Sequence, residues 1–269
     1  MITLPASILT RWFSLWLLVL TGLKIPGSDT CGIRNLTFMA GESIDFKVYY
    51  SVAGTYLAAG QASFATTLEV MNNKPVYHIT ALGSTLPFYD HFFKVRDRYE
   101  SYIDTLTLQP YKFIRNVAEG TYKKFEQVAF NKTTNTAITN AGCFHIPVCV
   151  QDVISAMYYA RNVDYTVLKN GDKIPFTLFL GDELYSLYIR YAGRETITTR
   201  YGTFQAIKVR PLLLKGAEFS GGETMNVWIS DDANRIPLRI ESAISVGSVK
   251  ADMMGFSNLR YPLTALIRR

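Results

Sequence analysis

The stretch "FFKVRDRYESYID", residues 92–104, sets the pattern from which the fold can be predicted. Its aromatic and aliphatic residues share one face of an extended chain, namely Phe93, Val95, Tyr99 and Ile103. Its charged residues share the other face, namely Lys94, Arg96, Arg98, Glu100 and Asp104. Alternation with a period of two is typical of a β-strand that is buried on one face and solvated on the other.

The same alternation recurs along most of the chain. It is found in "SIDFKVYY" (43–50), "QASFATTLEV" (61–70), "YKFIRNVAEG" (111–120) and "TYKKFEQVAFN" (121–131), and strand runs continue from residue 173 to residue 254. Turn residues separate these runs, and there is no room between them for helical crossovers, which predicts antiparallel pairing. We therefore predict a mainly β protein with one large curved antiparallel sheet, forming a half-barrel or a closed barrel.

One segment departs from this pattern. In "QDVISAMYYARNVDY", residues 151–165, apolar residues recur at intervals of three and four, and Asp152 is placed to cap a helix N-terminus. We predict a single amphipathic helix around residues 152–164.

Length and composition indicate a globular, exported protein. The 269 residues are 48% hydrophobic, which is enough for a core, and we predict a single β-rich domain over residues 31–269. Arg11 precedes an apolar stretch at residues 12–23, which predicts that residues 1–30 are a signal peptide or an N-terminal anchor. The net charge of +6 is spread without a basic run, so no nucleic-acid partner is expected, although association with a membrane surface fits this charge.

The chain has three cysteines, Cys31, Cys143 and Cys149. In an exported protein, Cys143 and Cys149 of "CFHIPVC" are expected to form a disulfide, which leaves Cys31 as a candidate lipid-bearing residue. The alternative pairs Cys31 with one of the other two and leaves the third free. A zinc site would need a fourth ligand that no nearby Cys or His supplies, so no metal is predicted.

The stretch "VWISDDANRIPLRIES", residues 227–242, contains two adjacent aspartates, Asp231 and Asp232. They are either a carboxylate pair for acid–base chemistry or the corner of a hairpin. Asp and Asn close turns by bonding their own backbone, so we favour the hairpin corner. Pro237 points to an edge strand or a bulge there, and Arg235 and Arg239 are close enough in sequence to neutralise the carboxylates.

No catalytic, phosphate-binding or dinucleotide-binding motif is found, and no cofactor is predicted. The charged face of residues 94–101 is the best site candidate. If it lines a cavity, Arg96, Arg98 and Glu100 would bind a carboxylate or phosphate head group; if it faces water, they form ordinary cross-strand ion pairs. With 17 Tyr and 16 Phe in the chain, rings such as those of Tyr49 and Tyr188 are further candidates for contact with an apolar ligand.

Several runs together carry a resemblance to a known family. They are "GESIDFKVYY", "AGQASF", "FFKVRDRYESYID", "CVQDVISAMYYAR" and "VWISDDANRIPLRIESAISVGSVKADM". From about Asn35 to Met254 the chain resembles the bacterial family called domain of unknown function 3108, as a Bacteroidetes-type member. The resemblance implies an exported protein with an antiparallel sheet, located in the periplasm or at the outer membrane of a Gram-negative bacterium. It passes on no functional residues.

The order of strands, helix and closing hairpin is also similar in layout to the half-barrels of periplasmic lipoprotein carriers. We therefore predict a non-enzymatic cell-envelope scaffold that binds a lipid or another apolar ligand. Two alternatives remain. One is an envelope hydrolase or isomerase that uses acidic residues such as Asp97, Glu100, Asp231 and Asp232, and the other is a structural protein that docks an envelope partner.

Overall fold

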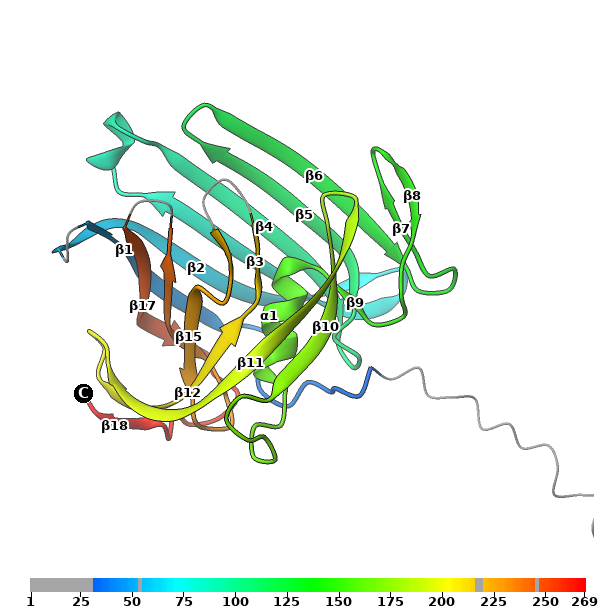
Figure 1. Ribbon diagram of the computed structural model, residues 1–269. Coiled ribbons are helices and arrows are strands. Elements are labelled where there is room, and N and C mark those ends of the chain that lie inside the picture. The colour runs from blue at the N-terminus through cyan, green and yellow to red at the C-terminus, as the bar shows by residue number, and fades with distance from the viewer. Residues whose placement is uncertain (1–30, 53–54, 216–219, 245–246) are drawn as a thin grey trace, which may run out of the picture. The chain divides into compact units, whose positions relative to one another are not determined.

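Two antiparallel meanders, joined edge to edge, make up the single large sheet of the protein (Figure 1). The computed structural model describes residues 31–52, 55–215, 220–244 and 247–269. The predicted signal peptide or anchor, residues 1–30, lies outside the described residues.

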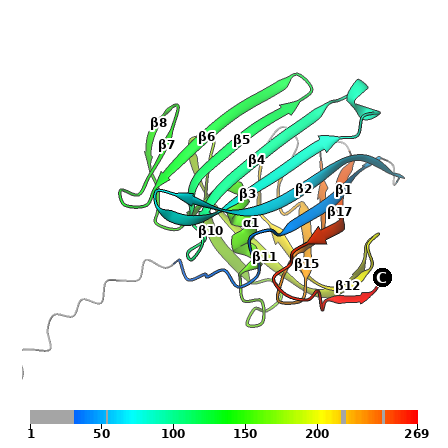
Figure 2. The same cartoon turned by 180° about the vertical axis from the view of Figure 1, so that it is seen from behind.

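The first meander runs from β1 to β8, with each strand paired to the next. Its strands are β1 (Ser43–Val52), β2 (Thr55–Met71), β3 (Lys74–Thr85), β4 (Val95–Asp104), β5 (Pro110–Glu119), β6 (Tyr122–Asn131), β7 (Thr136–Thr139) and β8 (Gly142–His145). A short 3-10 helix, η1 (Tyr89–His91), lies between β3 and β4. Seen from behind in Figure 2, β1 to β6 form one wide wall. This half confirms the strands predicted from alternation, including the turn at Glu119–Gly120 between β5 and β6.

The second meander follows the helix. It consists of β10 (Lys173–Leu180), β11 (Glu183–Thr198), β12 (Thr203–Pro211), β15 (Met225–Ser230), β16 (Pro237–Ala243) and β17 (Ser248–Ser257). Between β12 and β15 the chain forms a separate two-stranded sheet of β13 (Leu213–Lys215) and β14 (Ser220–Gly222), and β18 (Leu266–Arg268) pairs with β12.

The two meanders meet where the first strand pairs with the last. β1 pairs antiparallel with β17 from Ser43 opposite Ser257 to Ser51 opposite Ser248. The far edges of the sheet are β8 and the two-residue strand β9 (Val150–Gln151), and no backbone pairing joins these edges among the described residues. The predicted large antiparallel sheet is therefore confirmed in its unclosed form, with one parallel pair, β9 and β10.

The only α-helix of the described residues, α1 (Val153–Arg161), lies inside the curve of the sheet (Figure 1). Asp152 caps it, because its Oδ1 accepts the backbone N–H groups of Ile154 and Ser155, each at 2.8 Å. Its Oδ2 accepts the hydroxyl of Ser101 on β4 at 2.6 Å, which ties the cap to the first meander. The predicted helix is confirmed but is shorter than residues 152–164. It ends at Arg161, and the side-chain amide of the next residue, Asn162, donates to the Tyr158 carbonyl.

The first meander and α1 enclose a dense core. Its largest fully buried rings include Phe38, Phe113 and Phe179, and the helix contributes Ile154 and Tyr158. Although the sheet is not closed, side chains connect its two sides. Phe130 of β6 packs edge-on against Phe179 of β10, and Gly181 N donates to the buried Glu126 carboxylate at 2.8 Å.

The aspartate pair lies at a hairpin corner between β15 and β16, as predicted. Asp232 Oδ1 accepts from the backbone N–H groups of Asn234 and Arg235, the turn-closing pattern expected for Asp. The register shifts between Trp228 and Ile229, opposite Pro237, so the proline accompanies a bulge.

The prediction that Arg235 and Arg239 neutralise Asp231 and Asp232 is wrong. Arg194 of β11 binds Asp231 with an Nε–Oδ2 distance of 2.8 Å. Arg235 instead donates to the carbonyl of Val163, and Arg239 binds Asp252 on the neighbouring strand β17.

The cysteine pairing also differs from the prediction. Cys31 and Cys149 form the disulfide, with sulfur atoms 2.11 Å apart, while Cys143 is free and exposed. The predicted Cys143–Cys149 bond is therefore replaced by the alternative pairing. With its sulfur bonded to Cys149, Cys31 is not available in this structure as a lipid-bearing thioether. The physical reason is the position of the two candidate partners. Cys143 lies in β8, in the hairpin that β8 forms with β7, whereas Cys149 directly precedes β9, where Cys31 also lies.

Candidate functional site

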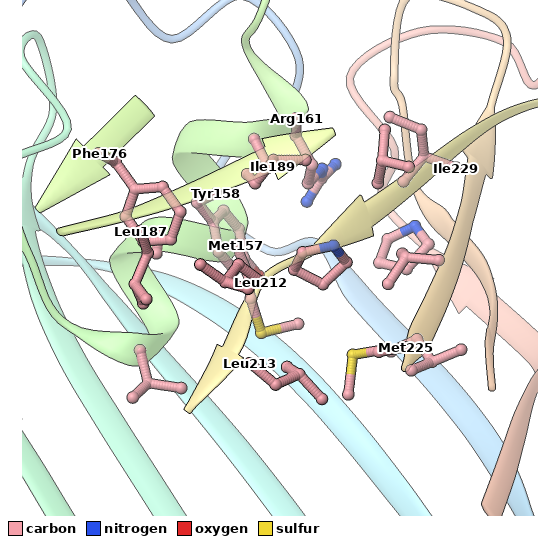
Figure 3. A pocket seen from close by; sticks show the side chains of 18 of the residues that line it. Met157, Tyr158, Arg161, Phe176, Leu187, Ile189, Leu212, Leu213, Met225 and Ile229 are labelled. Carbon is pink, nitrogen blue, oxygen red and sulfur yellow. The ribbon is translucent and has the colours of Figure 1, made fainter. Parts of the chain in front are cut away.

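A cavity of about 530 Å³ lies between α1 and the second meander. The helix contributes Val153, Ala156, Met157 and Ala160, and the second meander contributes inward-facing residues of β10, β11, β12, β15 and β16. Ile44 of β1 and Phe64 of β2, in the first meander, complete the wall. Figure 3 shows the side chains of Met157, Phe176, Leu187, Leu213 and Met225 around this space. A volume of this size is within the range typical of small-molecule sites.

The cavity wall is almost entirely hydrocarbon. All but three of its lining residues have apolar side chains, and the exceptions are Tyr158, Arg161 and Tyr165. The two phenol groups already have partners, because Tyr158 Oη lies 3.1 Å from Thr66 Oγ1 and Tyr165 Oη donates to the Ala160 carbonyl. Burial raises the pKa of Tyr158 to about 12, so this ring is neutral at physiological pH.

Arg161 is the one charged residue of the wall among the described residues, and its charge is balanced. Its guanidinium donates to both carboxylate oxygens of Glu42, at 2.6 and 2.9 Å, and to the Asn234 carbonyl. Burial alone would lower the pKa of Arg161, but Glu42 outweighs it and the pKa is raised. Its Nε has no hydrogen-bond partner in the described part of the chain. The cavity therefore offers hydrocarbon surface without a net charge.

The helix contributes to the packed core and to the cavity wall. Ile154 and Tyr158, four positions apart, belong to the core with the first meander, and Tyr158 also borders the cavity. Ala156 and Ala160, also four apart, line the cavity and are too small to fill it. The two alanines therefore leave space that larger side chains at these positions would occupy.

Leu212 and the strand β13 line part of the cavity. Leu212, Leu213 and Leu214 line it, and Leu212 N is fixed by a 2.9 Å hydrogen bond to the Tyr188 carbonyl on β11. These leucines, together with Met157 and Met225, were not singled out from the sequence. The apolar run "PLLL" at residues 211–214 could have indicated these leucines as cavity residues, but such a run is equally typical of a buried strand.

The predicted charged site on β4 lies on the face opposite α1. The inward residues of β4 are Tyr99, Ser101 and Ile103, so Arg96, Arg98 and Glu100 point outward. Each is already paired: Arg96 binds Asp90 at 2.5 Å, and Arg98 binds Glu100 at 2.7 Å.

Glu100 also belongs to a wider outer network. Its second oxygen lies 2.7 Å from His78 Nε2, and His78 Nδ1 lies 2.6 Å from Glu69. The hydrogen bond from Arg98 is the main reason that the pKa of Glu100 is lowered. None of these three predicted residues lines the cavity, and a ligand-binding role for them stays a prediction.

The two predicted tyrosines do not line the cavity either. Tyr49 lies beneath the cationic groups of Lys250 and Arg200, with its ring centre 5.2 Å from Lys250 Nζ. Tyr188 donates its hydroxyl to Glu223 at 2.7 Å, on the side of β11 opposite Leu187. Their contact with a ligand also stays a prediction.

The carboxylates of the alternative enzyme hypothesis do not converge. Asp97 and Glu100 lie on opposite faces of β4, and four strands of the sheet separate β4 from β16, the nearer strand of the corner that holds Asp231 and Asp232. Asp97 does share a hydrogen bond with Glu119, and burial raises the pKa of Asp97. This pair is outside the cavity wall. The described residues contain no group of three or more His, Cys, Asp or Glu side chains placed to hold a metal ion.

An unclosed antiparallel sheet wrapped around one helix, with an apolar cavity beside that helix, defines a β-barrel-like protein. The family described as "Protein of unknown function (DUF3108)" matches residues 45–254, which is most of the chain. The protein belongs to this family, which confirms the resemblance seen in the sequence. No curated protein matches it in sequence.

Solved structures are similar in fold. A β-barrel-like protein of the DUF1849 family from Brucella abortus has a TM-score of 0.54 at 7% identity, covering 82% of this chain and 98% of that one. A candidate lipoprotein from Parabacteroides distasonis reaches 0.38 at 14% identity, covering 84% and 99%. The lipoprotein LppX from Mycobacterium tuberculosis reaches 0.24 at 13% identity, covering 83% and 88%. The first of these similarities supports a shared fold, whereas the two lower TM-scores support no argument.

Proposed function

We propose that the protein is an exported, non-enzymatic cell-envelope protein that holds the hydrocarbon part of a lipid or another apolar ligand in the cavity beside α1. The observation that carries this proposal is the apolar cavity of about 530 Å³. Apolar groups leave water favourably, at about 25 cal/mol per Å² buried, so such a wall favours a hydrocarbon chain over any ionic ligand.

The polar groups of the wall narrow the ligand class. Since Glu42 neutralises Arg161, an additional anionic head group inside the cavity would be a buried charge without a counter-ion. The ligand is therefore an uncharged long-chain lipid, or an amphipathic lipid whose charged head stays outside the cavity.

The export part of the proposal is supported by two features. One is the apolar stretch at residues 12–23 after Arg11, and the other is the Cys31–Cys149 disulfide. Disulfides persist in oxidising compartments such as the periplasm, so this bond is consistent with a location outside the cytoplasm.

A binding assay tests the cavity. Val209 of β12 and Val227 of β15 are register partners that both line it, so the variant Val209→Phe/Val227→Phe adds two rings to the space. We expect its affinity for cis-parinaric acid methyl ester, an uncharged fluorescent chain, to fall at least about tenfold, because the probe loses buried contact area. The matched control is Leu68→Phe/Val70→Phe, at two exposed positions on β2, which should bind as the wild type does.

The native ligand can be sought directly. Mass spectrometry of an organic extract of the protein purified from cell envelopes should show a lipid in about one copy per chain. The proposal is wrong if the extract is empty and the wild type fails to bind the probe, or if the cavity-filled variant folds and binds as tightly as the control.

A further inference from the structure

An exposed aromatic cluster lies at one end of the first meander, outside the cavity. Three phenylalanines around η1 are largely exposed: Phe88 (69%), Phe92 (78%) and Phe93 (53%). Phe88 packs against Phe92 with ring centres 5.9 Å apart. Large apolar side chains gathered at one exposed place are unusual on a protein that is surrounded by water alone.

A second turn supports this cluster. The β5–β6 turn lies beside the β3–β4 connection, because Gly120 N donates to the Lys94 carbonyl at 2.8 Å. The ring of Phe93 covers Gly120 so closely that a Cβ there would lie 2.8 Å from it, and the positive φ of 57° also favours glycine. Tyr122, 52% exposed, follows on β6. The two turns form one protruding end of the sheet, which can be followed in Figures 1 and 2.

Two exposed lysines, Lys94 and Lys123, lie beside the aromatic cluster, and neither forms an ion pair with a carboxylate within the described residues. Arg96, which shares the outer face with Lys123, is paired with Asp90, so it contributes little net charge. Asp97 and Glu119 also lie at this end, on the opposite, inner face of the strands. The outer face of this end is therefore apolar at its tip and positive at its base.

We infer that this end, with Phe88, Phe92, Phe93 and Tyr122 as inserting residues and Lys94 and Lys123 as head-group contacts, docks on an anionic phospholipid membrane. Aromatic rings enter the boundary between head groups and acyl chains, while lysines attract anionic lipids. A protruding part of a protein can contact a flat lipid surface, whereas a concave part cannot. The charge around it is complementary to that surface, and this complementarity selects the membrane over a neutral protein groove.

The opposite end of the same strands provides the control. Leu68 and Val70 lie on β2 next to the β2–β3 turn, are 57% and 76% exposed, and are about 30 Å away along the strand. They match the tip in exposed apolar character but have no comparable aromatic cluster. Variants at both ends keep residues 1–30, so any membrane binding by that segment is the same in both.

The test measures vesicle binding of the full chain. The vesicles contain phosphatidylethanolamine and phosphatidylglycerol at three to one. We expect Phe92→Ser/Phe93→Ser to weaken partitioning about tenfold or more relative to Leu68→Ser/Val70→Ser. Lys94→Glu/Lys123→Glu should weaken it about tenfold as well, and should remove the difference between these vesicles and pure phosphatidylcholine vesicles.

A second measurement locates the contact without relying on those variants. In Phe92→Trp, the fluorescence of the added indole should be quenched by brominated lipid, whereas in Val70→Trp it should not. Equal partitioning of the two serine variants, with no quenching at residue 92, overturns the inference. It is also overturned if the wild type is a dimer in light scattering and Phe92→Ser/Phe93→Ser is a monomer, because the tip would then bind a second copy. Probe binding in the cavity is measured separately, so neither result depends on the other.

Discussion

Both meanders consist of antiparallel strands with alternating residues, but they pack differently against α1. Against β3 to β6, α1 is packed without space, with Phe113 and Val128 fully buried beside Ile154 and Tyr158. Against β10 to β16, the same helix leaves a cavity of about 530 Å³. Protein interiors are normally as dense as organic crystals, so a cavity of this size on one side only is a property of the residues chosen there.

One helix therefore serves both as a core element and as part of a cavity wall. Ile154 packs in the core, Ala156 and Ala160 line the cavity, and Tyr158 borders both. The packed half can then supply the stability, while the other half keeps apolar surface open. Three measurements test this comparison.

The largest difference is expected from one substitution made on both sides. Phe113→Ala in the packed half should lower the free energy of unfolding by about 3–5 kcal/mol, because it leaves a new void. Phe176→Ala enlarges a cavity that already exists. Its loss of unfolding free energy should therefore be about 1–2 kcal/mol smaller than that of Phe113→Ala. Urea unfolding of both variants measures this, and equal losses would contradict the comparison.

A pH effect is expected from the cap that joins α1 to the first meander. Burial raises the pKa of Asp152 from 3.8 to about 6, although its hydrogen bonds to Ser101, Ser155 and Ile154 act in the opposite direction. Between these two pKa values the folded state binds the proton that the unfolded chain has lost. The stabilisation from this group is therefore complete below pH 4, is lost as the pH rises through 6, and amounts to about 3 kcal/mol in all.

The variant Asp152→Asn isolates this titration. Its side chain keeps an acceptor for the cap but has no proton to lose, so the stability of the wild type relative to the variant should fall as the pH rises from 4 to 6. Urea unfolding across this range checks the slope. A constant difference would show that Asp152 has its ordinary pKa and that water reaches this side of the helix.

The smallest effect is expected from overpacking. Val128→Phe, on β6, should cost about 1–3 kcal/mol because no space is available for the ring. Val227→Phe, on β15, places the ring in the cavity and should leave the thermal unfolding midpoint nearly unchanged. If both valines are equally intolerant, then the cavity walls are as rigidly packed as the core.

Much of the fold could be predicted from the sequence because strand alternation is a local property. The runs at residues 43–50 and 111–131 form strands, with the turn at residues 120–121, and Asp152 caps the helix as expected. The run at residues 92–104 forms a strand only from Val95, and Phe93, predicted on the buried face, is 53% exposed beside η1. The hairpin corner at Asp231 and Asp232 was also readable, because Asp and Asn bond their own backbone. What failed was long-range pairing. The partner of Asp231 is Arg194, 37 residues away, and no local pattern brings them together.

The candidate site was not predictable in the same way. Val128 and Val227 are the same residue type, and both point to the inner face of their strands. Val128 is nevertheless packed in the core, whereas Val227 lines the cavity. The difference depends on the size of the side chain opposite, and that pairing exists only in three dimensions. Similarly, Arg96 and Glu100 were candidates because they share a face, but the sequence did not say that this face points away from α1.

The pairing of β1 with β17 has a consequence for how the chain reaches its native state. Ser43 and Ser257 are register partners, so the seam between the two meanders joins segments that are more than 200 residues apart in sequence. Contacts of such separation form slowly, because a long loop must close before the pairing is rewarded. During synthesis or export, the edges of β1 and β17 stay open until nearly the whole chain is present, and open strand edges are prone to aggregate. The last step of assembly, rather than the formation of the local strands, is therefore the stage at which the chain is most open to aggregation.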